Sequence, residues 1–168
     1  MSLIISVILT IAFIILLILI TISDIRTMEI PNGLVLGILG VGILDTLIQL
    51  EFLQWDSFLR DLFLWERLVG AVCVSLPLLL ITIIIPGAFG GGDIKLMAAA
   101  GLFLGFRLTL ISFFIGVVLG GFYGIWLLLA KKKDRKEHFA FGPFLCVGMI
   151  LSVFLGEWIL NWYLSFLF

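Results

Sequence analysis

The feature that most constrains this chain is a series of apolar runs, each long enough to span a lipid bilayer. The first run, residues 3–23, contains no charged side chain, and about 20 apolar residues suffice for a helix to cross the hydrocarbon core. Charged residues make up 12% of the chain and hydrophobic residues 63%, whereas soluble domains carry roughly 25% charged residues. We therefore expect an all-α fold and a polytopic membrane protein.

The apolar runs predict six transmembrane helices in one membrane-embedded domain, residues 1–168. The predicted crossings are residues 3–23, 33–50, 68–86, two helices that share residues 94–130, and 143–168. The shared segment holds two crossings if the chain turns near residues 105–107; in a five-crossing alternative, residues 94–106 only dip into the bilayer. The first run is interpreted as a crossing and not a signal peptide, because no basic residue precedes it and no small-residue cleavage site follows.

A segment of mixed character, residues 51–67, separates the second crossing from the third. Its aromatic and aliphatic residues recur at helical spacing with charges between them. This pattern is typical of a helix lying in the membrane interface. The alternative is a loop whose aromatic side chains anchor it at headgroup level.

The distribution of lysine and arginine predicts the orientation of the chain. With six crossings and the N-terminus outside, seven basic residues lie on the inner side: Arg26, Lys95, Lys131, Lys132, Lys133, Arg135 and Lys136. Three lie on the outer side: Arg60, Arg67 and Arg107. This asymmetry obeys the positive-inside rule, whereas five crossings would place the run that begins at Lys131 outside.

Two aspartates stand where polar segments meet apolar runs. Asp24 directly follows the first run, and Asp93 directly precedes the fourth. Two crossings separate them, so both carboxylates are expected at the same membrane face, where an ionisable group costs ~2.5–3.5 kcal/mol if it lies at bilayer depth. Each also has a structural interpretation: Asp93 as the N-cap of the following helix, and Asp24 as the end of the first helix, paired with Arg26.

Three glycines, Gly90, Gly91 and Gly92, directly precede Asp93. A capping aspartate needs no such clearance, whereas a protease must bring the substrate backbone within reach of a carboxylate and a water molecule. We therefore predict that these glycines bind substrate, with a tight turn between crossings as the alternative. Lys95 is a further candidate for this site, unless its side chain only extends to the interface.

Three segments together resemble the signature blocks of the type IV prepilin peptidases. They are DIRTMEIPN at residues 24–32, GGGDIKL at 90–96 and FGPFL at 141–145, and their order relative to the apolar runs matches as well. A GxGD sequence alone also occurs in presenilin-like proteases, but the chain has no PAL motif. Within the first block, Pro31 and Asn32 predict the start of the second helix, with Asn32 near its cap.

The resemblance implies that Asp24 and Asp93 are the catalytic residues of an aspartyl protease. Members of this family cut a short, basic leader from prepilin-like precursors at the cytoplasmic face of the cell membrane. Two neighbouring carboxylates share a proton, so one activates water while the other protonates the substrate, and no metal or other cofactor is expected. Long members carry paired CxxC motifs linked to N-methylation; this chain has no CxxC and resembles the short, peptidase-only forms.

Two other classes of function remain open at this point. A small proton- or ion-coupled transporter also uses intramembrane aspartates, although these usually lie near the bilayer midplane. A structural membrane subunit would leave the three glycines beside Asp93 unexplained. The net charge of −1 gives no indication of a nucleic-acid partner, so the expected partners are prepilin-like precursors and membrane lipid.

Overall fold

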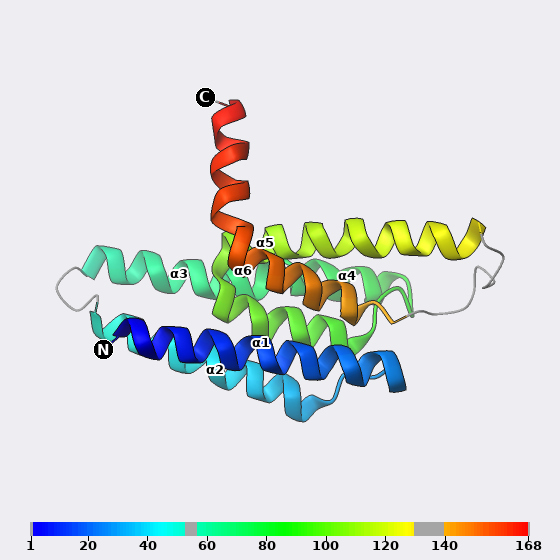
Figure 1. Ribbon diagram of the computed structural model, residues 1–168, viewed down its shortest axis with the longest axis horizontal. Helices are drawn as coiled ribbons and strands as arrows, with labels where there is room; N and C mark the ends of the chain where they lie inside the picture. The colour runs from blue at the N-terminus through cyan, green and yellow to red at the C-terminus, as the bar shows by residue number, and fades with distance from the viewer. Residues whose placement is uncertain (1, 53–56, 130–139, 168) are drawn as a thin grey trace.

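The computed structural model describes residues 2–52, 57–129 and 140–167, all arranged as helices and their connections. The helices are α1 (Ser2–Thr27), α2 (Asn32–Phe52), α3 (Ser57–Cys73), α4 (Ser75–Ile84), α5 (Gly91–Leu129) and α6 (Gly142–Leu167). No strand occurs within these ranges, so the predicted all-α fold is confirmed for them. Figure 1 shows α5 passing through the middle of the bundle, and α5 contacts α2, α3, α4 and α6.

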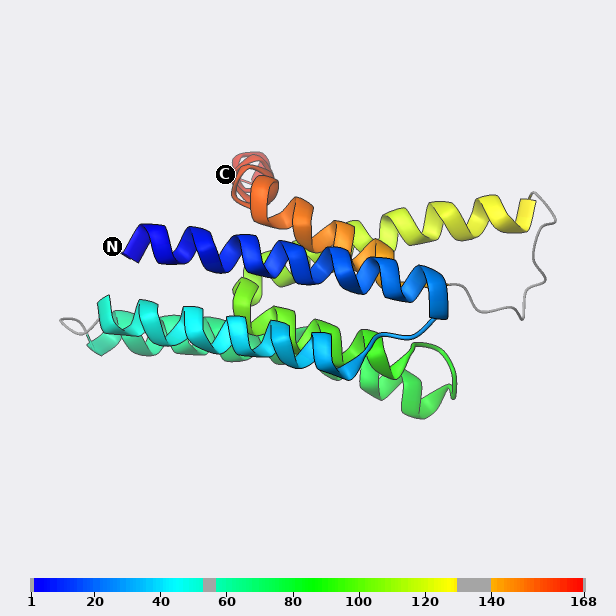
Figure 2. The same ribbon diagram turned by 60° about the horizontal axis from the view of Figure 1, so that its bottom comes forward.

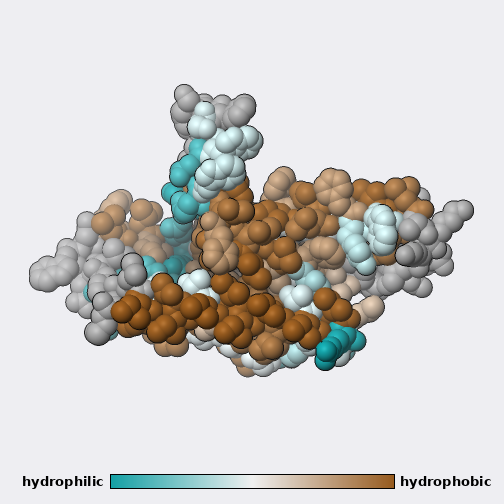
Figure 3. Space-filling model, viewed as in Figure 1, coloured by the Kyte–Doolittle hydropathy of each residue, from teal (hydrophilic) through white to brown (hydrophobic). Residues whose placement is uncertain are grey.

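Five stretches of the described residues are long and apolar enough to cross a membrane. They are Ile4–Thr27, Asn32–Glu51, Phe58–Ile84, Gly91–Leu127 and Gly142–Tyr163. Figure 3 shows that apolar side chains cover most of the visible face of the bundle, as a lipid-facing surface requires. These features fit a multi-pass membrane protein, and the difference from the predicted count of six lies in α5.

Helix α5 is broken at Gly105, within the segment where the sequence predicts a turn. The backbone of Gly105 has φ 74° and ψ 175°, a combination that side chains disfavour and glycine tolerates. Figures 1 and 2 show that the two halves of α5 run in opposite directions on either side of this break. The start and the end of α5 therefore lie at the same end of the bundle.

The predicted interfacial helix at residues 51–67 is wrong as a separate element. Residues 51 and 52 end α2. Residues 57–67 belong to α3, which continues past Leu68 to Cys73 and then leads into α4. Nothing between Arg67 and Leu68 interrupts a helix, whereas Pro77 lacks the N–H that would bond to the Cys73 carbonyl. The interruption therefore falls between α3 and α4.

Arg67, predicted in an outer loop, is instead buried inside the bundle, with 9% of its surface exposed. Its guanidinium lies 2.8 Å from the Asp45 carboxylate of α2 and donates to the carbonyl oxygens of Leu102 and Phe103. These carbonyls lie just before the break at Gly105, where the first half of α5 loses its next helical turn. Arg67 thus neutralises the buried Asp45 carboxylate and caps the first half of α5. Neither contact could be predicted from the apolar runs taken one at a time.

Glycines bring α3 and α5 into backbone contact. A Cβ atom at Gly70 would lie 2.5 Å from the carbonyl oxygen of Gly101, and a Cβ at Gly101 would collide with Gly70 in turn. Lipid tails are as apolar as helix side chains, so the hydrophobic effect does not favour helix–helix contact over helix–lipid contact. Close packing between small residues stabilises the association of the helices instead. The same device recurs between α5 and α6, where a Cβ at Gly148 would collide with the Ser112 carbonyl.

Candidate active site

The candidate site is a polar cavity at the end of the bundle where α1 ends and where α2 and α5 begin. Asp24 lies in the last turn of α1 and Asp93 in the first turn of α5; they are 5% and 7% exposed. Both line one cavity of about 270 Å³. The other residues around it are Met28, Glu29, Ile30, Asn32, Gly90, Gly91 and Gly92. Two aspartates from distant parts of the sequence therefore face the same small volume.

Asp24 is held at the point where α1 stops. Met28 ends the helix with φ 53°, a left-handed conformation that is uncommon for a side chain of this kind, and its N–H bonds to the Asp24 carbonyl at 2.9 Å. The backbone amide of Gly142 approaches the Asp24 carboxylate. Asp24 Oδ2 is buried and has no hydrogen-bond partner within the described residues, which leaves this oxygen available for chemistry.

Asp93 occupies the third position of α5, so its interpretation as the N-cap residue is wrong. The N-cap position falls to Gly90, whose carbonyl accepts the N–H groups of Asp93 at 3.1 Å and Ile94 at 3.3 Å. The Asp93 carboxylate reaches back to the Gly90 backbone amide, an arrangement like the acidic half of a capping box. The first turn of α5 thereby fixes the orientation of this carboxylate.

The two carboxylates interact electrostatically across the cavity. No ion pair between Asp24 and Arg26 occurs within the described residues, so the structural pairing considered for Asp24 is not formed there. Two buried carboxylates that repel each other when both are charged do not both ionise readily, and such a pair holds one proton between them. Among the described residues, no group of three histidine, cysteine, aspartate or glutamate side chains could hold a metal ion.

Lys95 does not line this cavity, although its partner Asn32 does. Its Nζ donates to Asn32 Oδ1 at 3.1 Å, which ties the start of α5 to the start of α2. Asn32 is the first residue of α2. The Pro31 carbonyl, one residue earlier, accepts the first helical N–H groups. A substrate-binding role for Lys95 stays a prediction.

The three glycines before Asp93 have different surroundings. A Cβ at Gly90 would lie 3.1 Å from Asp93 Oδ2, and a Cβ at Gly92 would lie 2.9 Å from the Cβ of Ile30. Gly91 has open space at this position and lines the cavity. Gly92 thus permits close packing between α5 and the IPN segment that follows Asp24, whereas substrate binding by the glycines stays a prediction.

We expect that Gly92→Ala lowers activity at this site by about ten-fold, because the new methyl group must displace Ile30 and with it the connection that follows Asp24; overpacking of this kind costs ~1–3 kcal/mol. Gly33→Ala is the matched control, since Gly33 is likewise the second residue of its helix and has nothing within 4 Å. Both variants would be compared by turnover at equal amounts of membrane-inserted protein. Equal turnover by the two variants would contradict the packing role of Gly92.

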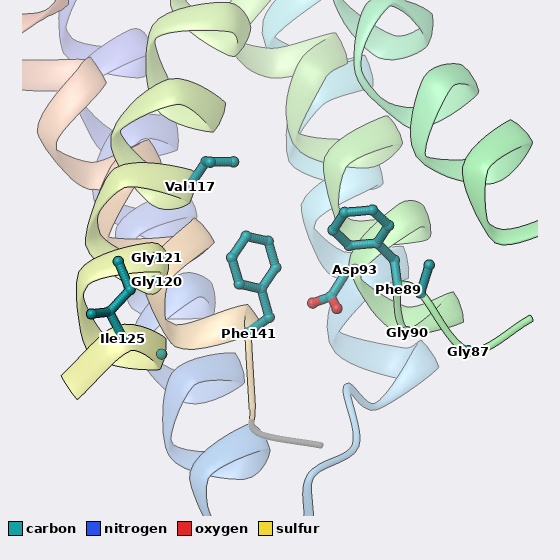
Figure 4. A pocket seen from close by; sticks show the side chains of 11 residues that line it. Gly87, Phe89, Gly90, Asp93, Val117, Gly120, Gly121, Ile125 and Phe141 are labelled. Atoms are coloured by element: carbon teal, nitrogen blue, oxygen red, sulfur yellow. The ribbon is translucent and has the colours of Figure 1, made fainter. Parts of the chain in front are cut away.

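A second cavity of about 460 Å³ adjoins the first and shares Asp93 and Gly90 with it. The rings of Phe89 and Phe141 contact each other at 6.1 Å between centroids, and Figure 4 shows the Asp93 carboxylate beside them. The remaining residues that line it are Gly87, Ala88, Val117, Gly120, Gly121, Gly124 and Ile125. Sequence reasoning missed this cavity, because its far wall comes from the second half of α5, which only the reversal at Gly105 brings opposite Asp93.

Gly142 is a further residue whose place at the site was missed. A Cβ there would lie 2.6 Å from Asp24 Oδ2, so the third sequence block, FGPFL, packs directly on the first. In the sequence, this block contributed only to the resemblance. The signal was present in the sequence as a glycine in a segment that otherwise favours bulky residues.

The fold and the site together define a multi-pass helical membrane protein with a buried aspartate pair at one end. The profile of the type IV leader peptidase family matches residues 11–125. The chain belongs to this family.

Curated relatives agree with the family. The chain is 32% identical over 156 residues to a protein of Bacillus subtilis (strain 168), covering 92% of this chain and 58% of the relative. It is 29% identical over 147 residues to a protein of Legionella pneumophila, covering 85% of this chain and 48% of the relative. Both are named prepilin leader peptidase/N-methyltransferase. The chain spans about half the length of these relatives, and no solved structure gives a significant match.

Proposed function

We propose that this protein is an aspartyl endopeptidase of the cell membrane that removes the leader peptide from prepilin-like precursors, with Asp24 and Asp93 as its catalytic pair. The observation that carries the proposal is that both aspartates are buried and line one cavity. Family membership supports the reaction, and the names of the relatives support the class of substrate.

The arrangement suits general acid–base hydrolysis of a peptide bond. The ionised carboxylate takes a proton from water as the water oxygen attacks the scissile carbonyl carbon, and the protonated carboxyl gives its proton to the carbonyl oxygen. In the second step the carbon–nitrogen bond breaks, the leaving amine takes a proton from the pair, and one hydroxyl of the tetrahedral intermediate returns its proton to the pair as the new carboxyl forms. The products are a new carboxyl and a new amine, and the pair again holds one proton.

A transporter fits this site less well. Both carboxylates lie in terminal turns of helices at one end of the bundle, whereas coupled transport places acidic groups near the midplane. The family of the chain also favours the peptidase.

The proposal is tested by co-expression of the protein with candidate precursors in a host without another prepilin peptidase. We expect a shortened product whose new N-terminus, read by mass spectrometry, lies directly before the apolar segment of the precursor. Precursors that remain full length beside inserted enzyme would overturn the proposal.

The proposed orientation has six crossings, both chain termini outside and the site at the cytoplasmic face, within one domain over residues 1–168. The crossings are α1, α2, α3 with α4, the two halves of α5, and α6. The reversal of α5 at Gly105 supports this count. With the buried Arg67 left out, seven basic residues expected inside against two outside support the orientation.

Single-cysteine labelling tests this topology. In a chain whose Cys73 and Cys146 are replaced with alanine, cysteines introduced at Ser2 and Glu137 should react with a membrane-impermeant maleimide from opposite sides. The physical reason is that five crossings separate the two positions if α5 crosses twice. Reaction of both positions from the same side would contradict six crossings.

A further inference from the structure

The two cavities that meet at Asp93 differ in chemistry. The smaller one is lined by three carboxylate residues, Asp24, Glu29 and Asp93, and by no lysine or arginine among residues 2–52, 57–129 and 140–167. The larger one is lined mainly by glycines and by apolar side chains such as Phe89 and Phe141. A peptide that presents its scissile bond to Asp93 has room to extend into both cavities, and it meets opposite environments on the two sides.

The polar cavity has an unsatisfied oxygen at Asp24 and an exposed carboxylate at Glu29. Asp24 Oδ2 is buried without a hydrogen-bond partner in the part of the chain that the structure describes, although buried polar atoms are normally satisfied. At the rim, Glu29 is exposed and forms no ion pair within the described residues. Its position is fixed, because its carbonyl accepts the hydroxyl groups of Ser23 at 3.4 Å and Thr27 at 3.3 Å.

The apolar cavity owes its room to one glycine in particular. A Cβ at Gly121 would meet nothing within 4 Å, whereas a Cβ at Gly120 would lie 2.7 Å from the Phe141 ring. Gly120 therefore lets Phe141 pack on α5, while Gly121 leaves part of the cavity unfilled. A large side chain of a bound peptide fits this space, beside Gly121 in the cavity that Val117 and Ile125 also line (Figure 4).

We propose that the two cavities orient the substrate across Asp93, with a cationic side chain before the scissile bond against Glu29 and a large apolar side chain after it beside Gly121. This assignment rests on the proposed peptidase function, from which the order of the two flanks along the peptide is taken. Glu29 and Gly121 then determine specificity, and neither belongs to the catalytic pair.

The role of Glu29 is tested with two purified precursors, one with its leader lysines intact and one with them changed to glutamine. Wild type should cleave the cationic precursor with the higher kcat/KM, and Glu29→Gln should reduce that preference by up to about five-fold, the scale of an exposed ion pair. Glu29→Lys should favour a precursor with glutamates at these positions. Glu51→Gln, an exposed glutamate at the other end of α2, should keep the wild-type ratio.

The role of Gly121 is tested with precursors that carry phenylalanine or alanine directly after the scissile bond. Gly121→Leu should lower the kcat/KM ratio of the phenylalanine precursor to the alanine precursor by about ten-fold, because the new side chain fills the space. Gly121→Ala should shift the ratio in the same direction by less. This variant replaces Gly121→Leu in the test if the larger side chain prevents membrane insertion. Gly40→Leu is the control, a helical glycine with an open Cβ position outside both cavities.

The outcomes separate this inference from the peptidase proposal. Wild type that cleaves neither precursor overturns both. Wild type that cleaves, with ratios unchanged by the Glu29 and Gly121 variants, overturns the substrate orientation alone. Ratios that shift at these two positions but not at the two control positions support it.

Discussion

Replacement of either Asp24 or Asp93 with asparagine is expected to abolish precursor cleavage while leaving the amount of membrane-inserted protein unchanged. Asparagine keeps the size and polarity of aspartate, but it cannot hold a negative charge or pass a proton. The loss should be on the order of a thousand-fold or more, and the double variant should be no worse than either single one, because members of a catalytic unit fail together. The measurement is precursor processing in membranes, normalised to enzyme level.

Asp61→Asn is the matched control, since Asp61 is exposed on α3 and lies 4.0 Å from Arg60 in a surface ion pair. It should process precursor at the wild-type rate. Substantial cleavage by Asp24→Asn or Asp93→Asn would remove that residue from the mechanism. A loss of inserted protein in either variant would instead assign the residue a structural role.

The largest loss of stability is expected from Arg67→Met. This change leaves the Asp45 carboxylate buried without its 2.8 Å partner and removes the donor that caps the carbonyls of Leu102 and Phe103. Breaking a buried pair by removing one partner typically costs about 3–5 kcal/mol. Unfolding of the purified protein in detergent, followed by circular dichroism with increasing denaturant, would measure the difference.

The double change Arg67→Met with Asp45→Leu should recover part of this loss, since it removes the unpaired charge along with its partner. Arg60→Met serves as the control, because the Arg60 side chain is 47% exposed and its loss should change stability little. Stability of Arg67→Met equal to that of Arg60→Met would show that the buried pair contributes nothing.

Much of the site could be predicted from the chain because its residues stand next to apolar runs. Counting the crossings between Asp24 and Asp93 predicted that both lie at the same end, and the structure places them in one cavity. The position of the break in α5 could also be predicted, because the run after Asp93 is too long for one crossing and contains Gly105. Both arguments depend on the thickness of a bilayer, a constraint that soluble folds lack.

The parts that could not be predicted depend on contacts between helices. Asp45 stands alone in an apolar run and Arg67 follows Glu66 at the edge of another. Nothing in the spacing of single runs shows that they pair across two helices. The same holds for Gly142, whose contact with Asp24 follows from the packing of α6 on α1. The extent of α3 was predicted wrongly for a different reason. The charges among residues 51–67 predicted a separate helix in the membrane interface, but no helix-breaking residue separates them from the apolar run that follows, and α3 continues to Cys73.

The hairpin at Gly105 has a consequence for how this chain can change over evolutionary time. Asp93 stands on one arm of the hairpin and Gly121 on the other, yet both line the same cavity. One residue inserted between Gly105 and Gly120 would turn everything after it by about 100° around the helix axis, and Gly121 would face away from Asp93. Exposed residues on that arm, such as Phe114 and Phe122, can change in identity, but the length of the arm is fixed by the angular register of the cavity wall.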